Sequence, residues 1–409
     1  MTAHVARLEA ASVVSSRHLA VAGLTLAALA AWVALPPLHV RGIALPVALG
    51  ALAVAAGAAA AARGAVRLGL TAVVAGVVGG ALGWIATLSG VSHLEVVFTW
   101  STLIASALVF TTPLTYAAIG GMVSERSGVV NIGLEGMMLM GCFWGIYGAD
   151  KTNSWVLGVA IAMLSGALLA LVHAFFSIQL RANQIVIGTA INFLAVGVTG
   201  YFFVDLYQGA NVPAGVPRIP AVHLAFLDHV PPASFGSFLY KSVGNLNLMI
   251  WFAFAIVVAS WYVVFRTPVG LRLRACGEHP RAADTVGIDV YAMRYGAVVV
   301  SGMLAATGGA FLSVGFVGTF NENMTAGRGF IALAAMIFGN WRPFGAFRAA
   351  FLFGLSTAVA IRMQVYSAAL PGIDVLIQIL PYVLTLIAVA GFIGRTRMPA
   401  ADGAPYKKQ

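Results

Sequence analysis

Charged residues are scarce in this chain of 409 residues: Asp, Glu, Lys and Arg make up only 9% of it, against roughly 25% in an ordinary soluble domain. Hydrophobic residues account for 60%, and 46 residues are glycine. A helix that crosses a bilayer needs about 20 mainly apolar residues. The composition therefore excludes a soluble globular protein and predicts an all-α, polytopic bundle of about twelve transmembrane helices.

Several kinds of reactive site are also missing. None of the four lysines (Lys151, Lys241, Lys407 and Lys408) follows a glycine, so the chain lacks the Gly-Lys-Ser/Thr of a phosphate loop and cannot supply its own ATPase of that type. The two cysteines, Cys142 and Cys276, are too far apart in sequence to suggest a disulfide framework. We find no histidine pair with metal-ligand spacing, no His-Glu-x-x-His and no Gly-x-Ser-x-Gly, which argues against a metal site and against an intramembrane enzyme.

Twelve apolar runs are interpreted as spans. Runs 132–148 and 330–344 are short and follow glycine-rich stretches, so each is either a full span or a re-entrant segment. Residues 1–30 could imitate a signal peptide, but the eleven further runs favour a retained first helix. The twelve runs are 19–36, 43–62, 68–89, 94–122, 132–148, 155–180, 185–204, 246–265, 295–317, 330–344, 347–365 and 375–393.

The basic residues fix a predicted orientation. Loop 266–294 holds five arginines and the tail after residue 394 holds Arg395, Arg397, Lys407 and Lys408. Short basic segments stay on the cytoplasmic side. We therefore predict that both termini are inside and that the long loop 205–245, whose charges cancel, is outside.

Segments 117–121 and 305–309 share the pattern Ala-Ala-x-Gly-Gly, and the predicted spans that contain them run in opposite directions. Inverted repeats with interrupted helices are a device of transporters. Small residues also simply permit close helix packing. Five residues do not decide between a repeat and packing.

Polar residues are rare inside the predicted spans. Asn131 and Glu135 stand one helical turn apart and are expected on one helix face. A carboxylate within a membrane costs about 2.5–3.5 kcal/mol on insertion scales, so Glu135 must have a partner, either a neighbouring helix or a transported solute. The shortage of such groups weakens a proton-coupled mechanism without excluding one.

Loop 267–289 contains Glu278 and Pro280, which suit the start of a short helix, and Gly287, which suits its end. A short charged helix in a cytoplasmic loop is what a membrane subunit needs to dock a cytosolic motor. An ordinary basic loop that only fixes topology is the alternative.

Several motifs in order resemble the permease subunits of binding-protein-dependent ABC importers, in the branch of ribose and branched-chain amino-acid permeases, and within it the nucleoside and simple-sugar subgroup. The resemblance covers roughly 94–394. Residues 1–93 depart from it and look like three added helices, followed by a permease core at 94–395 and a cytoplasmic tail at 396–409. The motifs are Pro113-Leu114, residues 124–141, 181–192, 270–290 and 327–339, Trp341-Arg-Pro343 and 381–385.

This resemblance implies a non-catalytic subunit in a bacterial cytoplasmic membrane, paired with a second permease and a separate ATPase that binds ATP and Mg²⁺. An extracytoplasmic binding protein or lipoprotein would deliver a nucleoside or simple sugar. A self-sufficient secondary carrier is the alternative. The candidate residues of the translocation path are Asn131, Glu135 and Asn192, with Asn192 preferred because a neutral amide exchanges hydrogen bonds cheaply. The loop that the resemblance identifies as the ATPase-coupling helix contains Glu278, Arg281, Ala282, Ala283, Asp284 and Gly287.

Overall fold

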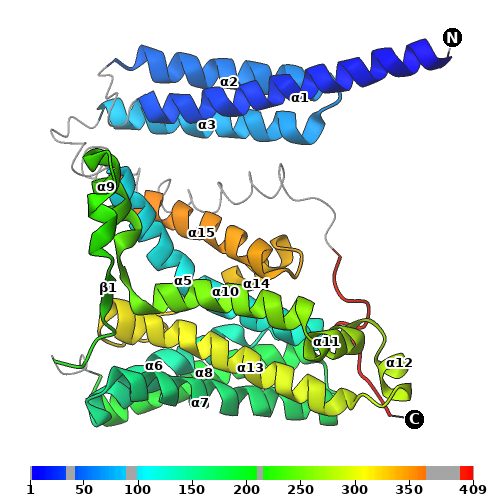
Figure 1. The fold of residues 1–409 in the computed structure, drawn as a ribbon, viewed down its shortest axis with the longest axis vertical. Coiled ribbons are helices and arrows are strands. Elements are labelled where there is room, and N and C mark those ends of the chain that lie inside the picture. The colour runs from blue at the N-terminus through cyan, green and yellow to red at the C-terminus, as the bar shows by residue number, and fades with distance from the viewer. Residues whose placement is uncertain (1, 34–41, 89–98, 210–214, 365–396, 409) are drawn as a thin grey trace. The chain divides into compact units, whose positions relative to one another are not determined.

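The computed structural model describes residues 2–33, 42–88, 99–209, 215–364 and 397–408. These residues are mostly helical (Figure 1). They form two compact units, Met1–Ile104 with Ser356–Arg395, and Ala105–Leu355 with Thr396–Gln409.

The first unit contains the helices α1 (Thr2–Val33), α2 (Ala44–Ala62) and α3 (Val66–Leu88), which pack on one another. Their contacts are made by small residues: a Cβ placed on Gly50 would lie 2.7 Å from the Cα of Gly80. Larger apolar side chains such as Leu52 and Val77 point outward and are exposed. Small residues inside and large apolar residues outside are the arrangement that suits helices surrounded by lipid.

The second unit holds most of α5 and the helices that follow it, as far as Leu355 within α15. Its long helices are α5 (Trp100–Arg126), α6 (Leu134–Thr152), α7 (Trp155–Ala174), α8 (Gln184–Tyr207), α10 (Leu248–Arg266), α13 (Val290–Ala310) and α15 (Pro343–Met363). Its shorter helices are α9 (Ala233–Leu239), α11 (Pro268–Glu278), α12 (Pro280–Thr285) and α14 (Arg328–Phe338). Three π-helical turns, η1 (Phe175–Gln179), η3 (Tyr240–Gly244) and η4 (Phe311–Val317), and the 3₁₀ turn η2 (Ala225–His229) continue or join them.

Helices α5, α6 and α13 form the centre of this second unit, because their residues are mostly buried whereas α7, α8 and α10 keep exposed apolar faces. The central helices approach backbone to backbone. A Cβ on Gly120 of α5 would lie 2.7 Å from the carbonyl oxygen of Ser301, and one on Gly308 of α13 would lie 2.9 Å from that of Pro113. The two Ala-Ala-x-Gly-Gly segments thus permit close packing of α5 on α13. The inverted repeat stays a prediction.

The strands β1 (Ala221–His223) and β2 (Asn245–Asn247) pair antiparallel within the long loop that precedes α10. Figure 1 shows this loop at one end of α10 and α13, and α11 and α12 at the other end. The 19 residues of α10 extend for about 28 Å at the ordinary helical rise, which is nearly the thickness of the hydrocarbon core. The loop and the short helices therefore lie at opposite ends of the bundle, as predicted; which end is cytoplasmic stays a prediction.

The described part of the chain has nine helices that are long and apolar enough to cross a membrane, so the protein is a polytopic helical membrane protein. Helix α6 occupies the predicted run 132–148 with 19 residues. The run 330–344 is not one helix: α14 has 11 residues and ends before Gly339, and the left-handed residues Asn340 and Trp341 precede α15. At about 17 Å, α14 is too short to cross the membrane alone. The predicted span 375–393 lies outside the described residues.

Candidate functional site

A buried break in the helical chain lies between α5 and α6, at residues 127–133. Side chains from three other helices satisfy its backbone. The amide of Val130 donates to Oε1 of Gln184 at 2.7 Å, the carbonyl of Val130 lies 3.0 Å from Nε2 of His173, and Nε of Arg294 donates to the carbonyl of Ser127 at 3.1 Å. Non-helical backbone at membrane depth is tolerated only where such partners replace water. The surrounding helices therefore stabilise this break.

Asn131 lies within the break and not on α6, so the prediction that it shares a helix face with Glu135 is wrong. Helix α5 ends at Arg126 and is followed by the left-handed Gly128 (φ +93°). Helix α6 begins only at Leu134, with Gly133 as its N-cap. Asn131 accepts the amide of Gly133 at 3.1 Å and donates through Nδ2 to Oγ of Ser301 at 2.9 Å. Its side chain thus joins the break to α13.

Glu135, in the first turn of α6, holds the N-terminus of α14. Oε1 accepts the hydroxyl of Thr325 at 2.6 Å and the amide of Gly327 at 2.7 Å, and Oε2 accepts the amide of Gly329 at 2.5 Å. Free amides at a helix start favour an acidic acceptor. The partner that Glu135 was expected to have is therefore a neighbouring helix.

Asn192 of α8 is buried beside the same turn. Its Oδ1 accepts the amide of Gly136 at 2.8 Å, and its Nδ2 donates to the carbonyl of Ile132 at 3.0 Å. The structure thus brings Asn131, Glu135 and Asn192 together around the start of α6, each bound to protein groups. Their contact with a transported solute stays a prediction.

Four residues of this site were not candidates from the sequence. Gln184, Ser301 and Thr325 are small or uncharged polar residues, and Arg294 was interpreted only as a topological charge. The signal for them is the same that singled out Glu135: a polar group in an apolar segment is costly without a partner. Serine and threonine give that signal weakly, because in helices they often bond to their own backbone.

Trp341 connects the segment after α14 to the end of α5. Its Nε1 donates to Oε2 of Glu125 at 2.6 Å, and its carbonyl accepts Nη2 of Arg126 at 2.8 Å. Trp341 and the Glu-Arg pair both belong to the motifs that carried the family resemblance. Both of the last two residues of α5 are therefore held by Trp341.

The predicted docking loop folds as two helices. In α11 the hydroxyl of Thr267 accepts the amide of Gly270 and Pro268 occupies the first turn. Pro280 starts α12, and Gly287 (φ +82°) follows its end, as predicted. Glu278 does not begin α12: it is the last residue of α11, and its carboxylate accepts the amide of Ala400 at 3.2 Å.

The six predicted coupling residues do not share one environment. Arg281 and Ala282 are exposed, as is Gly287 in the turn that follows. Ala283 is buried with Cys276, Val290 and Tyr406. Asp284 is half-buried: its Oδ2 accepts the hydroxyl of Tyr406 at 2.8 Å, and its Oδ1 lies 3.9 Å from Nζ of Lys408. The outward surface of this turn therefore consists of Arg281, Ala282, Thr285 and Val286.

The tail, residues 397–408, packs against the second unit and is not a free extension. The amide of Ala401 donates to the carbonyl of Gly277 at 2.8 Å, and Nη1 of Arg294 donates to the carbonyl of Ala404 at 3.1 Å. Burial raises the pKa of Asp402 to about 7, although its interactions with Glu125 and with the amide of Gly403 act in the other direction. Arg294 thus connects the tail to the break beside α5.

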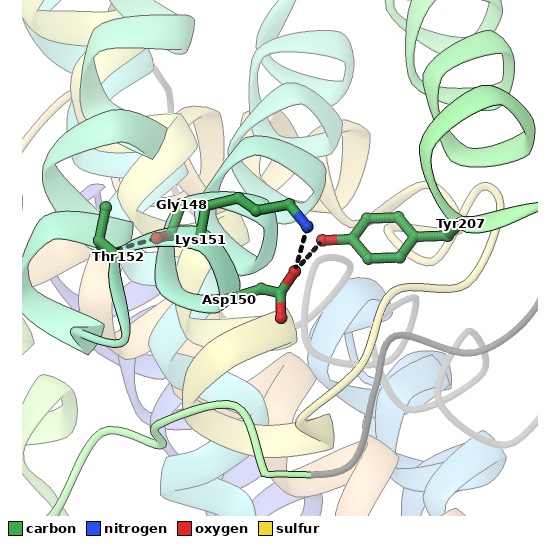
Figure 2. Close-up of polar contacts among 5 residues, drawn as sticks. All are labelled: Gly148, Asp150, Lys151, Thr152 and Tyr207. Atoms are coloured by element: carbon green, nitrogen blue, oxygen red, sulfur yellow. Dashed lines mark hydrogen bonds and ion pairs between the residues drawn. The ribbon is translucent and has the colours of Figure 1, made fainter.

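A further polar group lies at the other end of α6 (Figure 2). The hydroxyl of Tyr207 in α8 donates to Oδ2 of Asp150 at 2.9 Å, and Nζ of Lys151 lies 3.2 Å from the same oxygen. The Lys151 ammonium is also 5.8 Å from the ring centres of Tyr147 and Tyr207. These contacts hold the ends of α6 and α8 together.

Comparison with known proteins places the chain in a family. Residues 103–389 match the family described as "branched-chain amino acid transport system / permease component". A guanosine ABC transporter permease protein, NupQ of Bacillus subtilis, is 39% identical over 77% of this chain and 99% of its own length. A nucleoside ABC transporter permease protein, NupC of Lactococcus lactis, is 38% identical over the same shares. A putative glucose ABC transporter permease protein, TsgC13 of Haloferax volcanii, is 36% identical over 63% of this chain and 77% of its own length.

No solved structure matches the chain. The family match and the two nucleoside-type relatives confirm the resemblance that the sequence motifs indicated. With most of its length matched and its spans helical and apolar, the chain belongs to the family of branched-chain amino acid transport system permease components.

Proposed function

We propose that this protein is the permease subunit of an ABC importer that carries nucleosides across the cytoplasmic membrane. The observation that supports this most directly is its similarity over 99% of the length of two permeases named for guanosine and for nucleosides. Simple sugars are the second candidate class, because a permease named for glucose is 36% identical. A second, similar permease would complete the membrane part, and a binding protein or lipoprotein would deliver the solute.

ATP hydrolysis belongs to a partner subunit in this proposal, and α12 is the element that docks it. The turn is short, lies at one end of the bundle and presents Arg281, Ala282 and Val286 outward; Val286 is 74% exposed. An exposed apolar side chain next to an arginine is a typical feature of a surface that binds in a groove of another protein. Docking at this end requires it to be the cytoplasmic end, which agrees with the charge bias of the loops.

The polar groups around the start of α6 are proposed to border the translocation path. They lie among the central helices, beside the break at 127–133, and interrupted helices are a feature of transporter binding regions. Because Asn131, Glu135 and Asn192 are each bound to protein groups, we propose that they shape this region and that contacts with the solute are few and weak. Weak contacts favour release of the cargo, and the delivering protein supplies the affinity.

The extra helices α1–α3 are proposed to be peripheral to the path. They precede the region matched by the family, which begins at residue 103, and most of the buried residues that the structure describes in them are glycine and alanine.

Uptake of radiolabelled guanosine and glucose by cells that produce or lack this protein tests the function. We expect guanosine uptake that depends on this chain and on ATP, and that persists when a protonophore collapses the proton gradient. Uptake that follows the ion gradient without ATP would support a secondary carrier instead. Glucose competing as well as guanosine would shift the substrate to the sugar class.

Charge reversal at Arg281 tests the docking. Arg281→Glu is expected to lower both uptake and substrate-stimulated ATP hydrolysis at least tenfold while membrane insertion stays normal. The matched control is Arg348→Glu, an exposed residue of α15. Equal activity of the Arg281 variant and the wild type would remove α12 from the docking surface.

A further inference from the structure

Helix α12 is too short to hold its own position. It contains six residues, whereas isolated helices shorter than about 12 residues are marginal even with favourable sequences. Only Ala283 of this turn is fully buried, against Cys276 and Val290. Its orientation must therefore be set by other parts of the chain.

The tail contacts α12 and both of its flanks. Before α12, the amide of Ala401 donates to the carbonyl of Gly277. Within it, the hydroxyl of Tyr406 donates to Asp284. Beyond it, the Tyr406 ring packs with its centre 5.6 Å from that of Tyr291, whose hydroxyl donates to the Tyr406 carbonyl at 3.3 Å. A segment bound at three successive points restricts the turn between them.

Tyr406 is the central contact of this arrangement. It is 7% exposed although it lies only two residues before the end of the described tail. Its ring joins the apolar cluster of Cys276, Ala283 and Val290, and the guanidinium of Arg294 lies 5.9 Å from the ring centre. A buried tyrosine whose hydroxyl is hydrogen-bonded packs against apolar neighbours through its ring and fixes the position of its partner through the hydroxyl.

Asp284 consequently faces inward. Its two oxygens are directed to Tyr406 and Lys408, while Arg281, Ala282 and Val286 remain outward. We propose that residues 397–408 form a strap that fixes α12 in its docking orientation, with Tyr406 as the positioning residue and Asp284 as its anchor. The proposal rests on the docking of an ATPase at α12, and it assigns Asp284 to the strap and not to the partner.

Hydrogen exchange on the purified full-length permease tests the strap without any partner. Tyr406→Ala is expected to raise amide exchange at residues 279–288 at least tenfold, and Tyr406→Phe, which keeps the ring, by less. Met398→Ala is the matched control, because Met398 is an exposed tail residue outside these contacts. Exchange at 279–288 that is unchanged in Tyr406→Ala would overturn the strap.

The coupling readout uses membranes that contain the permease with the ATPase that co-purifies with it. Tyr406→Phe and Asp284→Ala are each expected to raise the ATP hydrolysed per nucleoside transported about threefold, with the KM for the nucleoside unchanged. The double variant is expected to match the worse single variant, because both changes break one contact. Additive effects would overturn the assignment of Asp284 to the strap, since they would mean that Asp284 acts separately from Tyr406.

Failure of the proposed function would look different from failure of the strap. Wild-type membranes without ATP-dependent uptake would reject the importer itself. Normal wild-type coupling together with normal coupling in Tyr406→Ala would reject the positioning role while leaving the importer intact.

Discussion

The carboxylate of Glu135 accepts the backbone amide of Gly329 at 2.5 Å, so the second residue of α6 caps the N-terminus of α14, far along the chain. Two further donors, from Thr325 and Gly327, bind the other oxygen. An acid in an apolar segment here stabilises a helix start that would otherwise leave amides unpaired.

Replacing Glu135 with glutamine is expected to destabilise the protein by about 2 kcal/mol, because hydrogen bonds to a charged group contribute about 1.5–3 kcal/mol and an amide NH₂ would face a donor. Thermal unfolding of the purified permease measures this. Glu322→Gln, on an exposed residue of the segment before α14, is the control. A variant as stable as the wild type with altered selectivity would make Glu135 a solute contact instead.

Asn192→Leu is expected to leave the amide of Gly136 and the carbonyl of Ile132 unpaired. Each unpaired group should lower the free energy of unfolding by about 1–3 kcal/mol. The result should be a lower unfolding temperature together with lower uptake. If only uptake falls and the unfolding temperature is unchanged, Asn192 contacts the solute and the hydrogen bonds to α6 contribute little. Thr189→Val on the exposed side of α8 gives the reference for a surface change.

Gly309→Ala is expected to lower the free energy of unfolding by about 3 kcal/mol or more. The added Cβ would overlap the backbone carbonyl oxygen of Met138, and a helix backbone cannot move aside as a flexible side chain could. Gly197→Ala is the matched control: that helical glycine has nothing within 4 Å of the new Cβ, so alanine should stabilise by up to about 1 kcal/mol. The two unfolding temperatures, measured in one detergent, should therefore move in opposite directions.

The pKa of Asp402, raised to about 7 from an ordinary value of 3.8, predicts a pH dependence for the tail. A carboxyl whose pKa is higher in the folded state stabilises docking when protonated, and this contribution is lost as the pH rises from about 4 through 7. A fluorophore on Lys407→Cys should thus report a looser tail at pH 8 than at pH 5.

Asp402→Asn is expected to remove that pH dependence. The groups that face Asp402 are Glu125 of α5 and Arg294 of α13. Because the interaction with Glu125 lowers the pKa of Asp402, Glu125→Gln should move the loosening of the tail to higher pH. Asp228→Asn, in the loop at the other end of the bundle, should leave it unchanged. If the fluorescence anisotropy of the permease labelled at Lys407→Cys, with Asp402 unchanged, is constant from pH 5 to 8, the prediction is wrong.

Hydropathy predicted the long helices well because each one must fill the bilayer by itself. The predicted run 43–62 became α2 at Ala44–Ala62, and 246–265 became α10 at Leu248–Arg266. Hydropathy failed at 330–344, where the chain turns at Gly339 and Asn340 between two apolar helices. Apolar composition does not reveal a turn whose backbone is buried in protein.

The polar site was only partly predictable for a similar reason. The cost of burying Glu135 and Asn192 identified them as important, but spacing alone placed Asn131 on the wrong element because it assumed an unbroken helix. The docking of the tail could not be inferred at all: residues 397–408 form a short segment without an apolar run, and only Pro399 and Tyr406 in it are buried.

The glycine contacts between α6 and α13 also determine which parts of the molecule can move. Gly141 of α6 faces Ala306, and Gly309 of α13 faces Met138, without side chains between the two backbones. At these contacts there are no side chains that could change rotamer and let one helix slide past the other. We therefore predict that the two helices move as one rigid pair during transport, and that the helices around them open and close any passage.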